Sequence, residues 1–212
     1  MEGIGIGIPG RLNKDNTSIT NSRTITQWID KPIVETLKKE FNCSVKMNND
    51  PYCAALSEAL VVQQKDFFFI ILGTGIGAAK VSYNNGKPHI LKFSNKEHAD
   101  YLHPWQKDCG GRWIAEKYGK SASELSNAEW SIIMERFYIH SLYFIEKLQP
   151  PSLVFSGGIA VKQWSRLQVV FTRLKAEHPA YKDLNIELAH YGEDAGLYGA
   201  LNLLEYERIG II

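Results

Sequence analysis

The chain has 212 residues, of which 44% are hydrophobic and 22% charged, and its formal net charge is +1. This length suffices for one large domain or two small ones with a sizeable buried core. The balanced charge and the scattered basic residues argue against nucleic acid as a main ligand. The longest purely apolar run, residues 67–72, is far too short to span a bilayer, so we expect no membrane partner.

The start of the chain and its cysteines predict a cytoplasmic protein. Met1 is followed at once by a glycine-rich strand, without the charged and apolar regions of a signal peptide. Cys43, Cys53 and Cys109 are odd in number and widely spaced, which favours free thiols in a reducing compartment over a disulfide framework.

The first elements along the chain are a strand, a loop, a helix and a strand. Residues 3–8 alternate glycine and isoleucine, which is typical of a buried strand that allows close backbone approach. The polar residues 11–30 predict a loop, and Asp30 is a natural cap for a helix with Pro32 in its first turn. Residues 43–47 predict a short strand.

The middle of the chain predicts a meander of strands. Phe67 to Leu72 reads as a core strand, and the chain returns over residues 78–83. Asn84-Asn85-Gly86 is a strong hairpin turn because Asn-Gly accepts positive φ. Residues 90–93 form the third strand, and residues 94–112 are expected to be irregular.

The C-terminal half predicts alternating helices and strands. Ser126 and Glu129 form a capping box ahead of a long helix, which Pro150-Pro151 ends. The other expected elements are a helix at 113–118, a strand at 153–155, a helix at 160–175, a strand at 185–189 and a helix at 194–206. We therefore expect an α/β protein.

Residues 1–48 supply too few strands for an independently stable sheet. The glycine-isoleucine strand would leave an apolar edge unpaired, which soluble proteins avoid. The sequence therefore indicates that partner strands are absent from it.

Five motifs follow one another in a fixed order, and their order is more informative than any one of them. They are Gly5-Ile6-Gly7-Ile8-Pro9-Gly10, Asn49-Asp50-Pro51-Tyr52-Cys53-Ala54-Ala55, Leu72-Gly73-Thr74-Gly75-Ile76-Gly77, Phe155-Ser156-Gly157-Gly158-Ile159-Ala160 and Glu193-Asp194-Ala195-Gly196-Leu197-Tyr198-Gly199-Ala200. Together they resemble the ROK family of sugar kinases, repressors and related open reading frames, over nearly the whole chain.

This resemblance implies the actin-like ATPase fold, which is ribonuclease H-like, with a largely complete C-terminal lobe and a truncated N-terminal lobe. Residues 1–48 would be the remnant of the N-terminal lobe, and residues 49–212 the C-terminal nucleotide- and sugar-binding lobe. Family kinases begin with an Asp-x-Gly-x-Thr loop that holds ATP phosphate, and this sequence starts after that loop.

Asp50 lies in an Asn-Asp pair that opens a helix at Pro51. By the resemblance, Asp50 is the general base that takes a proton from a sugar hydroxyl, and Asn49 hydrogen-bonds the sugar. A carboxylate suits this role because phosphoryl transfer needs mainly positioning, charge stabilisation and a weak base. The local sequence alone favours a simpler role for Asp50, that of capping the helix, and one carboxylate could serve both ends.

Two glycine-rich turns are candidates for binding a nucleotide. The first turn, residues 73–77, follows one strand and leads into another strand, whereas a dinucleotide fingerprint joins a strand to a helix. By the resemblance its N–H groups and the Thr74 hydroxyl face ATP phosphates, while the turn Gly157-Gly158 and Asp194 lie near the adenosine. Each motif also has a purely structural alternative: a hairpin bend for residues 73–77, tight helix–strand packing for Gly157-Gly158 and a helix cap for Asp194. The nucleotide candidates are Gly73, Thr74, Gly75, Gly77, Gly157, Gly158 and Asp194.

The segment 94–116 departs from the family pattern of Glu-x-x-His followed by Cys-x-Cys-Gly-x-x-Gly-Cys-x-Glu. Only His98 and Cys109 match zinc ligands, because Lys107 and Ile114 replace the other two cysteines. Structural zinc needs four ligands, so we expect no structural zinc and assign no metal-ligating residue, unless His103 and Asp108 complete a poor site. Glu116, His98 and Glu97 carry over as sugar ligands, and a solvated surface carboxylate is the alternative for both Glu97 and Glu116.

The function implied is ATP- and Mg²⁺-dependent phosphorylation of a hexose, either glucose or a related amino or acylated hexose, by a glucokinase-like transferase. The resemblance also implies a homodimer. Two alternatives stay open: a chain that lacks activity without the Asp-x-Gly-x-Thr loop, and a non-catalytic sugar-binding protein, either regulator-like or a degenerate remnant.

Overall fold

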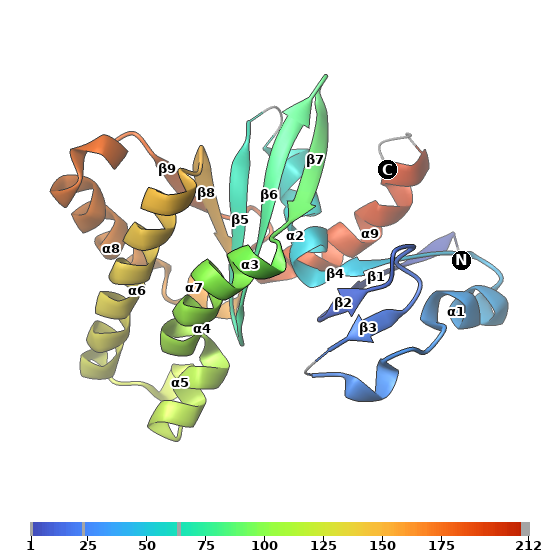
Figure 1. The fold of residues 1–212 in the computed structure, drawn as a ribbon, viewed down its shortest axis with the longest axis horizontal. Coiled ribbons are helices and arrows are strands. Elements are labelled where there is room, and N and C mark those ends of the chain that lie inside the picture. Colours follow the sequence, from blue (N-terminus) through green and yellow to red (C-terminus); the bar gives the residue numbers. More distant parts are fainter. Residues whose placement is uncertain (1, 23, 63–64, 209–212) are drawn as a thin grey trace. The chain divides into compact units, whose positions relative to one another are not determined.

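The computed structural model describes residues 2–22, 24–62 and 65–208, and its strands and helices confirm the α/β class (Figure 1). The strands are β1 (Gly3–Ile8), β2 (Arg11–Leu12), β3 (Ile19–Asn21), β4 (Ser44–Asn49), β5 (Phe67–Leu72), β6 (Ile76–Asn84), β7 (Lys87–Lys92), β8 (Ser152–Ser156) and β9 (Asn185–Leu188). The α-helices are α1 (Ile33–Phe41), α2 (Asp50–Val61), α3 (Asn95–Glu97), α4 (His103–Cys109), α5 (Gly111–Tyr118), α6 (Asn127–Leu148), α7 (Gly158–Lys162), α8 (Trp164–Glu177) and α9 (Ala195–Arg208). Within the described ranges, none of these helices combines the length and apolar character needed to cross a membrane.

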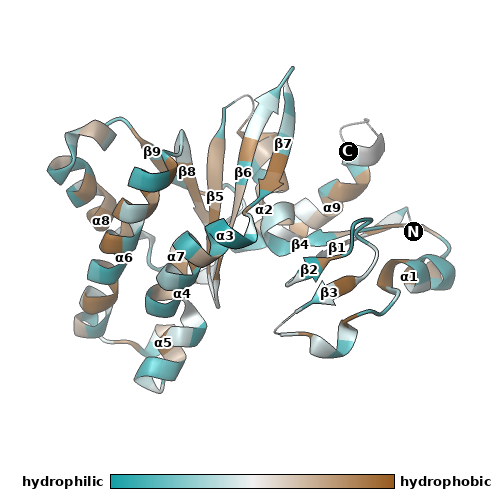
Figure 2. Cartoon of the chain, viewed as in Figure 1, coloured by the Kyte–Doolittle hydropathy of each residue, from teal (hydrophilic) through white to brown (hydrophobic). Residues whose placement is uncertain are grey.

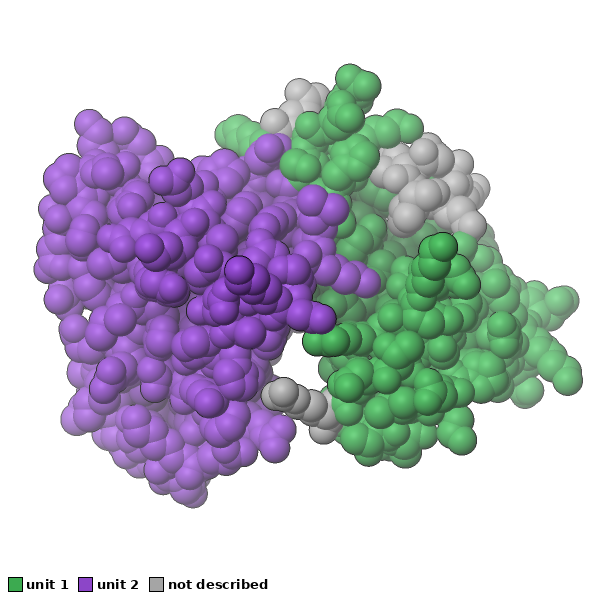
Figure 3. Space-filling view, in the orientation of Figure 1, with its two compact units in different colours: residues 1–65, 82–90, 194–212 green, residues 66–81, 91–193 purple. Residues whose placement is uncertain are grey.

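The chain forms two compact units, which Figure 3 colours separately. Unit 1 comprises residues 1–65, 82–90 and 194–212, and unit 2 comprises residues 66–81 and 91–193. These units follow contacts within the chain, whereas the lobe boundary after residue 48 follows a family resemblance and stays a prediction.

Unit 1 is built on the glycine-isoleucine strand. β1 pairs in parallel with β4, in register from Gly3 opposite Ser44 to Ile8 opposite Asn49. The glycines of β1 lie against α9, where a Cβ on Gly5 would come within 1.8 Å of the Ala200 carbonyl oxygen. The isoleucines on the other side join a small core with α1 and β4. The alternation therefore gives one face to a close helix and the other to a hydrophobic core.

Two expectations for residues 11–32 are wrong. The segment predicted as a loop contains the antiparallel pair β2–β3 and a short 3₁₀ turn at Thr26–Trp28. Asp30 does not cap α1, because it has a φ of +58° and Pro32 occupies the residue before the helix. Sequence propensity could not find the hairpin, since each of its strands has at most three residues.

Unit 2 contains most of a five-stranded sheet in the order β7-β6-β5-β8-β9. β5 pairs antiparallel with β6 and parallel with β8, which in turn pairs parallel with β9. The expected meander from β5 to β7 is confirmed. Most of β5 and β8 is coloured as hydrophobic in Figure 2, as expected for strands that are buried in the core.

An aromatic cluster fixes the helices of unit 2 on this sheet. Trp105 of α4 and Phe155 of β8 both contact Phe137 of α6, with ring centroids 5.1 and 6.0 Å apart. Phe171 of α8 completes the cluster at 5.3 Å from Phe155. These rings are almost completely buried, so they anchor α4, α6 and α8 on the sheet, and α6 also borders the pocket described below.

The segment expected to be irregular, residues 94–112, is mostly helical. α3 leads without interruption into a π-helical turn at His98–Leu102 and then into α4. Ser94 and Glu97 form a capping box at its start: the Glu97 N–H donates to Ser94 Oγ at 3.2 Å, and the Ser94 N–H donates to Glu97 Oε2 at 2.9 Å. This Ser-x-x-Glu signal stands in the sequence and could have predicted the helix.

Candidate functional site

Unit 2 contains a pocket of about 980 Å³ where two glycine turns meet. Gly73 and Thr74 come from the turn between β5 and β6, and Gly157 and Gly158 from the turn between β8 and α7. A Cβ on Gly73 would lie 4.0 Å from the Gly158 nitrogen, so the two turns are neighbours. The other lining residues are Ile71, Gly111, Arg112, Ala115, Glu116, Ser121, Ala122, Ser123, Trp130, Ile159, Lys162, Gln163 and Glu193. This volume is at the upper end of the range for small-molecule sites.

The turn at residues 73–75 is fastened to the start of α5. The Gly111 N–H donates to the Gly73 carbonyl at 2.8 Å, and the Arg112 N–H donates to the Thr74 carbonyl at 2.9 Å. Within the described ranges, the N–H groups of Thr74 and Gly75 make no backbone or side-chain hydrogen bond. Unpaired N–H groups in such a turn attract anions, and phosphate oxygens are the common example.

The second turn depends on Gly157, whose φ is +93°. A Cβ there would lie 2.7 Å from the Leu72 carbonyl oxygen at the end of β5. The neighbouring Ser156 hydroxyl donates to the Gly192 carbonyl at 2.6 Å and so ties the end of β8 to the loop before α9. Glycine is required at residue 157 both by conformation and by space.

Two cations line the pocket, and sequence reasoning did not single them out. Arg112 Nε pairs with Glu116 Oε1 at 3.0 Å, and Lys162 Nζ pairs with Glu193 Oε1 at 3.6 Å. Both pairs are exposed, so each contributes little to stability and either cation can turn to an anionic ligand instead. Lys162 lies one helical turn after Gly158, a spacing that could have pointed to it.

Asn49 and Asp50 belong to unit 1, where α2 begins. The helix is capped by Asn49, whose Oδ1 accepts from the Tyr52 N–H at 3.3 Å, so the alternative that Asp50 is the cap is wrong. Asp50 reaches solvent, yet the surrounding protein desolvates its carboxylate and raises its pKa to about 6. A hydrogen bond from its own backbone N–H moderates this rise.

The predicted sugar ligands lie at different places. Glu97 forms an ion pair with Lys80 of β6 in addition to its capping box with Ser94. The contact with Lys80 makes the largest contribution, and together these contacts lower the pKa of Glu97 to about 2. His98 begins the π-helical turn. Glu116 lines the pocket of unit 2 beside the predicted nucleotide turns. The sugar-binding role of all three stays a prediction.

The nucleotide candidates divide in the same way. The pocket of unit 2 brings together Gly73, Thr74, Gly157 and Gly158. Gly77 lies within β6 opposite Ile71 and is not part of the lining. Asp194 precedes α9 and belongs to unit 1.

The ROK family model matches residues 1–93. Over these residues the chain is similar to the ROK family. It is 28% identical to the N-acetyl-D-glucosamine kinase of Mannheimia succiniciproducens, over 94% of this chain and 79% of that relative. Its structure resembles a ROK family protein from Streptococcus pneumoniae solved with sucrose, at a TM-score of 0.75 and 22% identity, covering 99% of this chain and 82% of that one. It also resembles a ROK family glucokinase from Streptomyces griseus solved with glucose and AMPPNP, at a TM-score of 0.69 and 17% identity, over 96% and 81% of the two chains. The predicted actin-like ATPase fold is confirmed.

The cysteine that matches the zinc loop of ROK proteins lies in the hydrophobic core of this chain. Cys109 is almost completely buried, and its thiol donates to the Ile133 carbonyl at 3.8 Å. Burial, and next the charge of Asp108, raise the pKa of this thiol well above its usual range. Asp108 itself accepts from His140 Nε2 at 2.8 Å, if that nitrogen carries the proton. Among the described residues, no three His, Cys, Asp or Glu side chains are grouped so that they could hold a metal ion.

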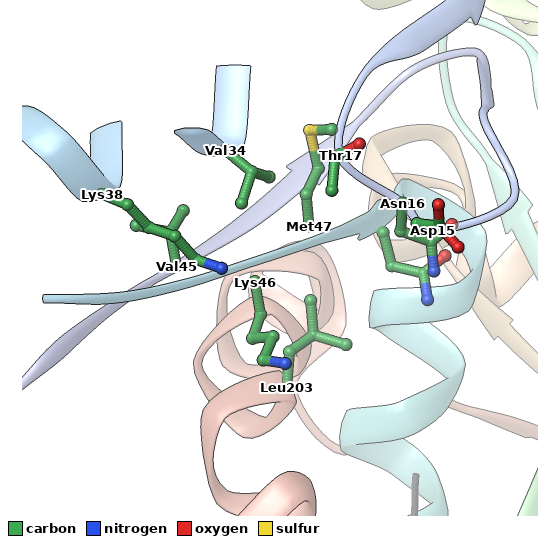
Figure 4. A pocket seen from close by; sticks show the side chains of 10 residues that line it. Asp15, Asn16, Thr17, Val34, Lys38, Val45, Lys46, Met47 and Leu203 are labelled. Carbon is green, nitrogen blue, oxygen red and sulfur yellow. The ribbon is translucent and has the colours of Figure 1, made fainter. Parts of the chain in front are cut away.

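A second, smaller pocket lies in unit 1 and has a volume of about 240 Å³ (Figure 4). It lies between the loop at residues 15–17, α1, β4 and Leu203 of α9, and Lys38 and Lys46 are among its lining residues. Its volume is below the usual range for small-molecule sites, and none of the sequence-predicted site residues lines it.

Proposed function

We propose that this chain carries the site of an ATP-dependent hexose kinase that acts on an N-acylated hexose such as N-acetylglucosamine, or on glucose. The observation that carries the proposal is the meeting of two glycine turns at one pocket, with unpaired N–H groups on the first turn. The name of the Mannheimia relative supports the choice of sugar.

The nucleotide would occupy the pocket of unit 2. In this proposal the N–H groups of Thr74 and Gly75 and the side chains of Arg112 and Lys162 face the phosphates. Gly157 and Gly158 allow the adenosine to approach the backbone closely. Asp194 of unit 1 and Gly77 keep their proposed nucleotide roles from the family resemblance alone.

The donor set of the pocket suits Mg²⁺. Magnesium in such sites usually keeps several waters and takes one or two carboxylates together with phosphate oxygens, and Glu193 would supply the carboxylate. When bound, the ion neutralises charge on the transferred phosphoryl group.

The acceptor step is assigned to Asp50. Its carboxylate takes the proton of the sugar hydroxyl while the hydroxyl oxygen forms a bond to the γ-phosphorus and the bond to ADP breaks. A pKa raised to about 6 makes this carboxylate a better base than an ordinary aspartate while it is still ionised near neutral pH. Asn49, His98, Glu116 and Glu97 are proposed to bind the hexose hydroxyls.

The test is hexose-dependent ADP release by the purified chain, with N-acetylglucosamine, N-acetylmannosamine and glucose compared. The 212 residues contain no Asp-x-Gly-x-Thr sequence, so the same assay is run on the longest natural reading frame that includes them. We expect release that Asp50→Asn abolishes. If neither chain releases ADP with any hexose and neither binds AMPPNP, the proposal is wrong.

The second candidate is a non-catalytic sugar-binding protein, and the likeness to a ROK family protein solved with sucrose supports it. Isothermal titration with each hexose separates the two. A sugar binder keeps its hexose affinity in Asp50→Asn and releases no ADP in either form. A homodimer stays a proposal for both candidates, and light scattering on the eluting protein tests it.

A further inference from the structure

Gln106 of α4 is hydrogen-bonded to the strand that follows the phosphate-facing turn. The Ile76 N–H, the first of β6, donates to Gln106 Oε1 at 3.0 Å across 30 residues of sequence. Gln106 is half-buried and does not line the pocket of unit 2. Its contact with the turn is therefore separate from any contact with a ligand.

The side chain of Gln106 also packs directly on the turn. A Cβ on Gly75 would lie 2.7 Å from Gln106 Oε1, so only glycine leaves room for the amide at its present place. Gly75 belongs to the glycine-rich motif of the turn, and the close approach of the Gln106 amide is a second reason for glycine at this residue.

The backbone of Gln106 fixes the next element of the same assembly. Its carbonyl accepts from the Gly110 N–H at 2.8 Å at the end of α4. The next two N–H groups, those of Gly111 and Arg112, hold the carbonyls of Gly73 and Thr74. Backbone bonds from α5 thus hold Gly73 and Thr74, and the side chain of Gln106 holds Ile76 directly after the turn.

We propose that Gln106 is a positioning residue for the nucleotide site, which keeps the 73–75 turn in its binding conformation before the phosphates arrive. This inference rests on the proposed function in that it takes a nucleoside triphosphate as the ligand. A turn that is ordered beforehand loses less conformational entropy on binding, and affinity rises accordingly. Gln106 thereby acts on nucleotide affinity without touching the nucleotide.

The decisive variant is Gln106→Met, which keeps the length of the side chain and removes the acceptor. Loss of one hydrogen bond of ordinary net strength predicts a rise of about five- to tenfold in the Kd of Mg²⁺–AMPPNP, measured by calorimetry. Hydrogen exchange at the Ile76 amide should accelerate by a similar factor. In the active enzyme the KM for ATP should rise while kcat at saturating ATP stays nearly unchanged.

Two further variants separate positioning from general damage. Gln106→Glu keeps an acceptor of the same reach, so exchange at the Ile76 amide should stay slow. Lys107→Met changes the exposed neighbour on the same helix and should alter neither exchange nor affinity. If Gln106→Met melts at a much lower temperature than the wild type, Gln106→Ala with the same readouts replaces it.

The outcomes also separate this inference from the proposed function. If the wild type binds AMPPNP and Gln106→Met binds it equally well with a fast-exchanging Ile76, the positioning role is wrong and the proposed function stands. If the wild type does not bind AMPPNP, the nucleotide site itself is wrong, and this inference is wrong with it. Fast exchange at Ile76 confined to Gln106→Met, together with weaker binding, supports the role.

Discussion

Gly199 of α9 lies so close to Cys53 of α2 that a Cβ on Gly199 would come within 1.6 Å of the Cys53 carbonyl oxygen. Both residues are buried within unit 1. Because α2 begins at Asp50, this approach fixes the helix that presents the proposed base. The same helix α9 also lies against the glycines of β1, so α9 joins the two motifs that stand first in the sequence.

Gly199→Ala should strongly destabilise the protein. Overpacking of a buried contact typically costs about 1–3 kcal/mol, and here the obstacle is backbone rather than a movable side chain. A fall of several degrees in the melting temperature is expected from thermal unfolding followed by circular dichroism, since ~1 kcal/mol corresponds to about 2–4 °C at this size.

The matched control is Gly196→Ala, on the same helix. Nothing lies within 4 Å of a Cβ at Gly196, and alanine is the better helix former. Its melting temperature should stay level or rise. Equal melting temperatures for the two variants would show that the α2–α9 approach is looser than the structure has it.

The pKa of Asp50 predicts the pH dependence of the reaction. A base must be ionised, so the rate at saturating hexose should fall as the pH drops through about 6 rather than through 4. Asp50→Asn should lower the rate by about 10²- to 10⁴-fold at every pH, as expected for loss of a general base. Asp30→Asn is the control, because Asp30 is exposed in a left-handed conformation that asparagine adopts equally well. A wild-type profile that is flat down to pH 5 would contradict the assignment.

The same pKa predicts that Asp50→Asn does not weaken the fold. Because the folded-state pKa of Asp50 lies above its unfolded value of 3.8, the protonated form is the one that folding favours. This contribution to stability is present in full below the unfolded pKa and is lost as the pH rises through about 6. At pH 7.5 the variant should therefore melt at the wild-type temperature or slightly above it, and the difference should vanish at pH 4. A lower melting temperature at pH 7.5 would show that the carboxylate stabilises the fold.

The sequence predicted best the elements whose signals are local. The capping box of Ser126 and Glu129 gave the start of α6, and the Asn-Gly turn gave the hairpin between β6 and β7. The capping box at Ser94 is an equally local signal, and it begins the helical segment that contains His98.

The assembly around the phosphate-facing turn could not be predicted in this way. Gln106 meets Ile76 only because α4 folds back beside the start of β6. No sequence pattern around a glutamine predicts a contact with a residue 30 positions away. The choice of Asn49 over Asp50 as helix cap was likewise undecidable from sequence, because both residue types cap helices well.

The buried Cys109 predicts that zinc has no effect on the fold. Its thiol lies in the core and its pKa is raised, so it is not a thiolate ligand near neutral pH. A thiol reagent added to the native protein should modify the half-buried Cys43 first, and it should reach the buried Cys109 only after the protein unfolds. Chelator or added zinc should leave the melting temperature unchanged, and Cys43→Ser should remove the fast-reacting thiol. A melting temperature that rises with added zinc, together with slower modification of Cys109 by the reagent during unfolding, would show a zinc site at this cysteine.

Gly157 and Gly158 offer a paired test of the nucleotide pocket, because only one of the two residues is conformationally required to be glycine. An alanine at Gly157 would need a positive φ, at about 1–2 kcal/mol, and would also press on the Leu72 carbonyl. An alanine at Gly158 would lie 3.4 Å from the end of the exposed Glu193 side chain, which can move aside. Gly157→Ala should therefore lower the melting temperature by several degrees and weaken AMPPNP binding more than tenfold, whereas Gly158→Ala should keep the wild-type melting temperature. If Gly158→Ala also weakens AMPPNP binding, the nucleotide approaches the Cα of residue 158. If both variants bind AMPPNP as tightly as the wild type does, the nucleotide binds at another place.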